Sequence, residues 1–152
     1  MERGIVLSLF DRYANTVYRV ALSYLRSPQE AEDAVQTVFL KLLESSAEIY
    51  AGKERAFLTK LTINHCKNVL SAAKRHETLP LDEAAQLVRP EDRDLFLAVM
   101  ELPEKYRTVI ILHCFEGYSL REISQLLHIG ISAVSMRLYR AKNILKKQIG
   151  RD

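Results

Sequence analysis

Apolar residues recur every three or four positions along almost the whole chain, and this spacing is the feature that most restricts its fold. In the first stretch the repeat is carried by Phe10, Tyr13, Val17, Ala21 and Tyr24. A period of 3.6 residues gathers such side chains on one face of an α-helix, whereas a half-buried strand would need strict alternation. We therefore predict an all-α protein.

The first two helices are predicted from this repeat and from the residues between them. The first runs from about residue 5 to residue 26 and ends before Ser27-Pro28. Ser27 can cap the second helix, Pro28 suits its first position, and Glu30 has the spacing of a capping box. Glu32, Asp33 and Gln36 are expected on the outer face. The expected buried stripe is Ala31, Ala34, Val35, Val38, Phe39 and Leu42.

A third helix is predicted from about residue 53 to residue 74, after a loop of small residues and glycine at 45–52. With the first two helices it would complete a three-helix bundle over residues 1–75. Its expected packing residues are Phe57, Leu61, Ile63, Cys66, Val69, Leu70 and Ala73. Its polar face carries Lys60, Asn64, Lys67 and Asn68 at helical spacing.

The stretch 76–94 is the predicted linker, because it combines prolines with an acidic excess and lacks a sustained apolar stripe. A short helical turn is considered at 82–88, and a second small domain is predicted over 95–152. There Leu95, Val99 and Leu102 indicate one helix. Pro103 begins another, which ends near Gly117. Its expected inward residues are Val109, Ile110 and His113, with Cys114 as a further candidate, and His113 is interpreted as a packed core residue.

The stretch 119–147 predicts two helices joined by the turn His128-Ile129-Gly130. Ser119 and Glu122 have the spacing of a capping box. The inward residues would be Ile123, Leu126 and Leu127 of the shorter helix and Val134, Leu138, Ala141 and Leu145 of the longer one. The outer residues would be Ser132, Ser135, Met136, Arg137, Tyr139, Arg140, Lys142, Lys146 and Lys147. Such a helix-turn-helix, positive on its second helix, fits the DNA major groove, although plain helical bundles contain similar turns.

Charge alternates in blocks although the formal net charge is only +3. Residues 28–48 hold one cation against five acids, and residues 76–104 hold two cations against eight acids. Residues 53–75 hold six cations against one acid, and residues 105–152 hold nine against three. The basic blocks are candidate nucleic-acid faces, while the acidic blocks suit a different partner. Solvated helix faces are the plain alternative.

Several classes of protein and site are disfavoured by the sequence. The chain has no run of about 18 apolar residues, so we expect no membrane span and a cytoplasmic location. Cys66 and Cys114 are expected to be reduced, buried thiols. Each follows a histidine, but adjacent helical residues point apart, so no metal site is predicted. Catalytic residues and a cofactor are not expected either, because no nucleophile–base pair or glycine-rich phosphate loop is recognisable.

Two motifs resemble those of the σ70 family of bacterial transcription initiation factors. EAEDAVQTVFLKLL, at 30–43, is similar to the polymerase-binding helix of that family. LPEKYRTVIILHCFEGYSLREISQLLHIGISAVSMRLYRAKNIL, at 102–145, resembles the domain that reads the promoter −35 element. The two motifs have the family's order, and the chain length leaves room for domains 2 and 4 alone. This layout is that of the extracytoplasmic-function (ECF) group.

The resemblance implies a sigma factor, which is not an enzyme and whose partners are core RNA polymerase, promoter DNA and, in some members, an anti-sigma factor. Polymerase would contact Glu32, Asp33 and Gln36. The melted non-template strand of the −10 element would contact the loop before the third helix, with Lys60, Asn64, Lys67 and Asn68. The −35 duplex would contact Ser132, Ser135, Met136, Arg137, Arg140 and Lys142.

Some positions depart from the family pattern and leave two alternatives open. Asn68 replaces the usual Asp, Ser71 an Arg, His128 a Gly, Gly130 a Ser and Ser135 a Lys, while Phe57-Leu58 replaces Trp-Leu. A diverged chain could be a sigma-like interaction protein that no longer reads promoters. It could also be a stand-alone helix-turn-helix regulator, which would not need the surface of Asp33 and Gln36.

Overall fold

The computed structural model describes residues 1–72, 82–86 and 88–149, and within these ranges it contains helices, turns and loops but no strand. The prediction of an all-α protein is thereby confirmed. The chain divides into two compact units, Met1–Pro80 and Leu81–Asp152, and this division falls within the stretch 76–94. None of the described helices has both the length and the apolar character that crossing a bilayer requires.

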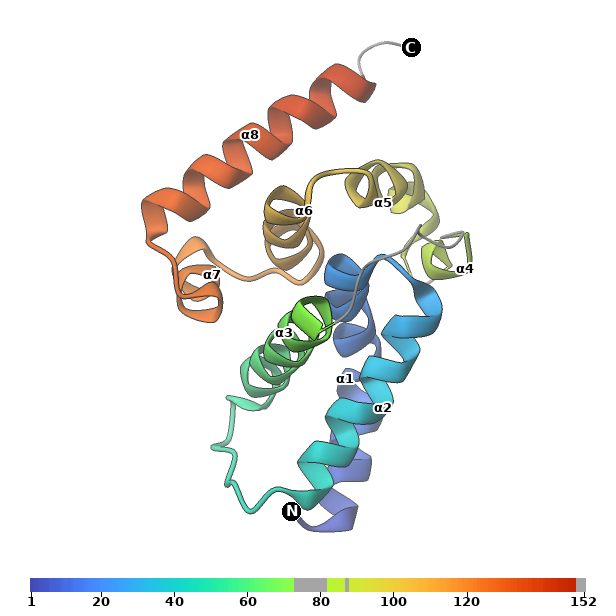
Figure 1. The fold of residues 1–152 in the computed structure, drawn as a ribbon, viewed down its shortest axis with the longest axis vertical. Helices are drawn as coiled ribbons and strands as arrows, with labels where there is room; N and C mark the ends of the chain where they lie inside the picture. Colours follow the sequence, from blue (N-terminus) through green and yellow to red (C-terminus); the bar gives the residue numbers. More distant parts are fainter. Residues whose placement is uncertain (73–81, 87, 150–152) are drawn as a thin grey trace. The chain divides into compact units, whose positions relative to one another are not determined.

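The first unit is a bundle of three helices, α1 (Arg3–Leu25), α2 (Pro28–Glu44) and α3 (Glu54–Ala72), each of which contacts the other two (Figure 1). α1 ends at Arg26, which adopts the left-handed conformation with φ of 56° and turns the chain toward α2. The ring of Phe10 on α1 meets that of Phe39 on α2 edge to face at 5.1 Å. The buried core comprises Val6, Leu9, Val17, Val35, Val38, Phe39, Leu42 and Leu58.

The second helix forms as the sequence predicts. The Ser27 side chain accepts a hydrogen bond from the Glu30 amide at 3.2 Å, and Pro28 occupies the first turn, where its missing amide hydrogen is not needed. Every residue of the predicted stripe is buried, namely Ala31, Ala34, Val35, Val38, Phe39 and Leu42. The polar outer face of α2 follows directly from the packing of its apolar side.

The packing face of α3 differs from the prediction. Phe57, Leu61, Val69 and Leu70 are only half-buried, and the fully buried positions are Leu58, Thr59, Thr62, Ile63 and Cys66. α3 packs against both α1 and α2, so its buried face is broader than one apolar stripe. Threonine is tolerated there because the Thr62 hydroxyl donates to the Leu58 carbonyl at 2.7 Å, which leaves no unsatisfied donor. Predicted residues 73 and 74 lie outside the described ranges.

The second unit begins with short elements and ends with the helix-turn-helix. A predicted helical turn at 82–88 appears as α4 (Asp82–Ala85), followed by a 3₁₀ turn at Pro90–Asp92 and by α5 (Arg93–Met100). Leu95, predicted to face inward, is half-buried, and its neighbour Phe96 is buried instead and meets the ring of Phe115 at 5.9 Å. Then come α6 (Glu104–Ile110), α7 (Leu120–Leu127) and α8 (Ile131–Ile149), and α8 packs along α6 and α7 (Figure 1).

α6 continues into a π-helical turn, Ile111–Phe115, in which the Glu116 amide donates to the Ile111 carbonyl at 2.9 Å. The helix ends before Gly117, as predicted, and Gly117 adopts a φ of 76° that a side chain would disfavour.

The prediction that Cys114 is buried was wrong. A π turn holds more residues than an α turn, so positions after it rotate about the axis. Cys114 consequently faces solvent while His113 is half-buried, with its Nδ1 2.8 Å from the Tyr118 carbonyl oxygen.

Candidate polymerase and nucleic-acid interfaces

The outer face of α2 is a surface of mixed character. Glu32, Asp33 and Gln36 are all exposed, as the apolar stripe predicts. Leu40 and Leu43 lie seven and ten positions beyond Asp33 and therefore continue the same helical face. They are 58% and 39% exposed. These two leucines were not among the residues predicted for the outer face, although their spacing from the buried stripe places them there.

The polar face of α3 brings together the four residues predicted for the −10 element. Asn64, Lys67 and Asn68 are exposed and Lys60 is half-buried. These positions fall within about one quarter of the helix circumference, because successive residues are separated by about 100°. Amide groups can hydrogen-bond to base edges, and the lysines supply positive charge for a nucleic-acid backbone. The arrangement is therefore suited to a single strand lying along α3.

One contact ties α3 to α2 beside this face. The Lys41 Nζ on α2 lies 3.3 Å from the His65 Nδ1 on α3. Burial lowers the pKa of His65 from its ordinary value, and the nearby charge of Lys41 lowers the pKa further. A neutral imidazole can accept a hydrogen bond from the ammonium group, whereas a protonated one would repel it. His65 therefore joins the two helices only in its neutral form.

The helix-turn-helix is built as predicted. The Glu122 amide donates to the Ser119 hydroxyl at 3.1 Å, and the Ser119 amide donates to the Glu122 carboxylate at 2.9 Å, which completes a capping box. His128 ends α7 in the left-handed conformation with φ of 56°. The conformation explains why glycine suits this position, since side chains disfavour it. All predicted inward residues are buried, namely Ile123, Leu126, Leu127, Val134, Leu138, Ala141 and Leu145.

α8 presents the six residues predicted for the −35 duplex, but not all to the same degree. Ser132, Ser135, Met136, Arg140 and Lys142 are exposed. Arg137 is half-buried because it lies at the border of the packed stripe rather than opposite to it. The structure also exposes Tyr139, which lies between the predicted residues on the outer face but was not included in the predicted site.

A shallow hollow of about 590 Å³ lies at the start of α8. It is lined by Leu120 of α7 and by Ile131, Ser132, Ser135, Met136 and Tyr139 of α8. The charged residues of the recognition helix are not part of this lining. The hollow therefore gives the first half of α8 a different surface chemistry from its second half, which the sequence analysis did not anticipate.

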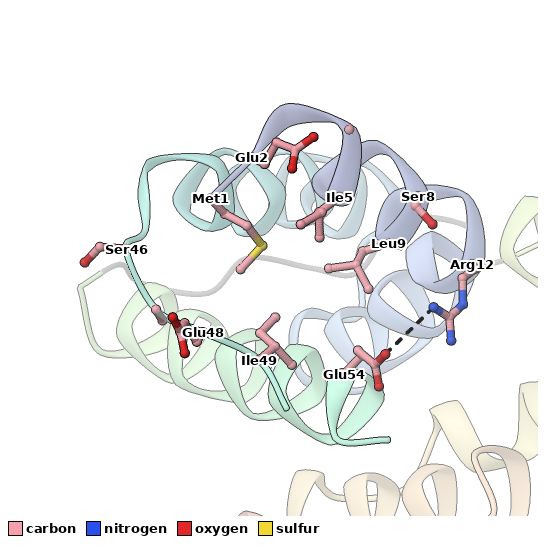
Figure 2. Close-up of a pocket in the computed structure, with 12 residues that line it drawn as sticks. Met1, Glu2, Ile5, Ser8, Leu9, Arg12, Ser46, Glu48, Ile49 and Glu54 are labelled. Carbon is pink, nitrogen blue, oxygen red and sulfur yellow. Dashed lines mark ion pairs between the residues drawn. The ribbon is translucent and has the colours of Figure 1, made fainter. Parts of the chain in front are cut away.

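A larger hollow of about 700 Å³ lies in the first unit, between α1 and the loop before α3 (Figure 2). Figure 2 shows the side chains of Met1, Leu9 and Ile49 reaching into it. Arg12 and Glu54 close one side with their charged groups 3.9 Å apart. Its other charged side chains are Glu2 and Glu48. Three carboxylates line this hollow together with the Arg12 guanidinium and the Met1 ammonium group, whereas the lysines of the α3 face have no carboxylate among the four predicted residues, so that face attracts phosphate groups more strongly.

Within the described residues, no three histidine, cysteine or carboxylate side chains come together in a way that could hold a metal ion. His65 and Cys66, adjacent in sequence, differ in environment, since Cys66 is fully buried and His65 faces Lys41.

Family models and known proteins match most of the chain. A model described as Sigma-70 region 2 matches residues 9–76, and one described as Sigma-70, region 4 matches residues 92–145. The chain is 28% identical over 157 residues to the RNA polymerase sigma factor SigV of Bacillus subtilis, covering 99% of this chain and 94% of the relative. It is 26% identical over 148 residues to the ECF RNA polymerase sigma factor SigM of Mycobacterium tuberculosis, covering 93% and 76%.

A solved structure has the same fold. The sigma factor RpoE of Bartonella quintana, crystallised in complex with the anti-sigma factor NepR, matches with a TM-score of 0.72 at 17% identity, covering 94% of this chain and 95% of that chain. Region 2 coincides with the three-helix unit and region 4 with the unit that ends in the helix-turn-helix. The chain belongs to the σ70 family of RNA polymerase sigma factors, in its ECF group.

Proposed function

We propose that this chain binds core RNA polymerase, directs it to a set of promoters and helps to melt them. The observation that carries the proposal is the presence, in family order, of regions 2 and 4 with their candidate contact faces turned outward. The polymerase supplies the chemistry of RNA synthesis, so the chain itself is not an enzyme. It acts where the polymerase and the chromosome are, in the cytoplasm.

Region 2 has two tasks in this proposal. Glu32, Asp33 and Gln36 on α2 bind the polymerase, since an acidic and amide-bearing face is poorly suited to DNA but well suited to a basic protein surface. Lys60, Asn64, Lys67 and Asn68 on α3, with the loop before it, hold the melted non-template strand of the −10 element. A strand with unstacked bases needs hydrogen-bonding groups and cations in register, which this face offers.

Region 4 reads the −35 duplex in this proposal through α8, which the helix-turn-helix presents to the major groove. The contacts are assigned to Ser132, Ser135, Met136, Arg137, Arg140 and Lys142. We assign the domain limits as 1–75 and 95–152, joined by the linker 76–94. Regulation by an anti-sigma factor is included in the proposal because the similar sigma factor of Bartonella quintana was crystallised with one.

The experiment that tests this function adds the purified chain to sigma-free core polymerase with fragmented genomic DNA from its own source and maps the transcript starts. Discrete starts that share two elements at a fixed spacing are expected. Core binding without discrete starts would favour an interaction protein, and a shifted duplex without any core binding would favour a stand-alone regulator.

The docking surface is tested by the double substitution Asp33→Ala and Gln36→Ala. We expect core affinity to fall about thirtyfold or more, the effect of losing one interface hot spot of about 2 kcal/mol. The matched control replaces exposed residues of the same two types elsewhere, Asp11→Ala and Gln125→Ala. Equal core affinity of the two double variants would contradict the assignment of the α2 face.

A further inference from the structure

The hollow at the start of α8 is an unusual surface for a helix that is expected to bind DNA. Its three large apolar residues, Ile131, Met136 and Tyr139, are 45%, 48% and 64% exposed. Such residues normally pack inward, and the buried stripe of this helix is complete without them. Together with Leu120 they line one hollow, so the exposure is concentrated at one place rather than scattered.

The position of the hollow on the helix matches the part that meets base edges. Ser132, Ser135, Met136 and Tyr139 have the spacing i, i+3, i+4 and i+7, which places them along one face. They occupy the first half of α8, and the N-terminal residues of a recognition helix are those that contact bases in a helix-turn-helix. The exposed cations Arg140, Lys142, Lys146 and Lys147 follow in the second half.

The order of these residues along α8 separates phosphate contacts from base contacts. The cations can meet phosphates, which fix the helix on the duplex without reading its sequence. The hollow ahead of them would then face the floor of the major groove. Its lining side chains include no Arg or Lys for the paired acceptors of guanine, no Asn or Gln for adenine, and no carboxylate for the amino group of cytosine.

One base has an apolar group at its major-groove edge, the C5-methyl group of thymine. We propose that the hollow binds thymine methyl groups of the −35 duplex and that Met136 and Tyr139 are specificity-determining residues for thymine. This inference rests on the proposed function and deepens it, since it states which base the first half of α8 selects. The unbranched Met136 side chain adapts to the small, irregular space above a methyl group, and the Ser132 and Ser135 hydroxyls can hydrogen-bond to either partner of a base pair.

The experiment uses the full chain assembled with core polymerase. A promoter pool with a randomised upstream element is selected by this holoenzyme, and the enriched element is resynthesised with each thymine replaced singly by deoxyuridine, which removes the methyl group alone. We expect at least one replacement to weaken holoenzyme binding about fourfold, the effect of exposing one buried methyl group. The holoenzyme with both Met136→Ala and Tyr139→Ala should bind the thymine and deoxyuridine elements equally.

The matched control is Ile149→Ala, which removes an apolar side chain that is 52% exposed at the far end of the same helix. This variant should keep the full preference for thymine. Equal binding of both elements by the unmodified holoenzyme would overturn the inference, and so would a preference that survives in the double variant. A holoenzyme that forms but enriches no element would remove promoter reading and the inference with it, and absent core binding, measured separately, would remove the proposed function first.

Discussion

α3 and α8 are both 19 residues long and both carry a proposed nucleic-acid face, but they are built differently. α8 buries one narrow apolar stripe, Val134, Leu138, Ala141 and Leu145, and leaves the rest of its circumference exposed. α3 is covered from two sides by α1 and α2 and buries threonines along with apolar residues. The buried stripe of α8 is recognisable in the sequence because it is entirely apolar, whereas the buried face of α3 is obscured because it includes Thr59 and Thr62.

The exposed faces of α3 and α8 also differ in the residues that they carry. α3 offers amides and lysines intermixed at neighbouring positions, as a single strand with accessible bases would require. On α8 the exposed apolar residues Ile131, Met136 and Tyr139 come first and the exposed cations from Arg140 onward follow, with the half-buried Arg137 among the former, an order that suits a duplex with bases in a groove and phosphates at its edges. The comparison therefore links the form of each face to the form of DNA that we assign to it.

The largest expected effect tests how α3 is packed. Leu58→Ala should destabilise the first unit by about 2 to 5 kcal/mol, because Leu58 is fully buried and its truncation leaves a cavity. Phe57→Ala, which removes more atoms from a half-buried site, should cost less. Native-state hydrogen exchange of the α1–α3 amides measures both changes in the same region. A larger loss for Phe57→Ala would mean that the apolar repeat in the sequence locates the core of α3 better than the structure does.

This pair of residues also shows what the sequence could predict of the fold. Positions such as Val38 and Leu138 were predicted from periodicity because each lies on a helix with one buried side. Leu58 and Thr62 were not predicted to be buried because the buried face of α3 includes threonine, whose hydroxyl is bonded inside its own helix, and this polar residue type interrupts the apolar repeat. The exposure of Cys114 was not predicted because a π turn changes the angle between successive residues about the helix axis. No pattern of residue types in the sequence indicated that turn.

Part of the candidate site could be predicted from the sequence, namely the residues that motifs, charge and the buried stripes indicate. Asp33 and Gln36 followed from the buried stripe of α2, and Arg140 followed from that of α8, and all three are exposed. Tyr139 was predicted to face outward but was not included in the predicted site, and Ile131 was named only as the start of the helix. That they are exposed around a shared hollow is a property of the three-dimensional surface and not of the spacing alone.

The next effect distinguishes base contacts from phosphate contacts within α8. Arg140→Ala should cost about 1 to 3 kcal/mol on the preferred −35 element and relax the preference at one position, if the exposed Arg140 reaches a base. Lys147→Ala, farther along the helix, should weaken binding to all sequences alike. Holoenzyme affinities for the enriched element and for single-base variants measure both. A uniform loss for Arg140→Ala would make it a phosphate contact and move the boundary between the two halves of α8 toward the hollow.

A smaller expected effect concerns the salt dependence of DNA binding by α3 and α8. The logarithm of affinity falls with the logarithm of salt concentration by about 0.9 for each duplex phosphate contact and by about 0.7 for each single-strand contact. Lys67→Ala on α3 should therefore reduce the slope measured with a fork-junction template, and Lys142→Ala on α8 the slope measured with the −35 duplex. An unchanged slope for Lys67→Ala on the fork template would remove the single-strand assignment of α3, because its most exposed cation would then contact no backbone.

The smallest expected effect is a pH dependence that belongs to α3 and has no counterpart in the described part of α8. His65 is half-buried and faces Lys41, and burial first and the charge of Lys41 second lower its pKa below the ordinary value of about 6.5. The unfolded chain therefore binds a proton more readily than the folded one. The contribution of His65 to the stability of the first unit should be fully present above pH 6.5 and should decline as the pH falls below it.

His65→Gln should flatten this decline, and Lys41→Met should lessen it only in part, because burial is the larger cause. Thermal unfolding of the three proteins at pH 7.5 and pH 5.5 measures the difference, and an equal decline in all three would show that carboxylates elsewhere, and not this contact between α2 and α3, set the acid sensitivity.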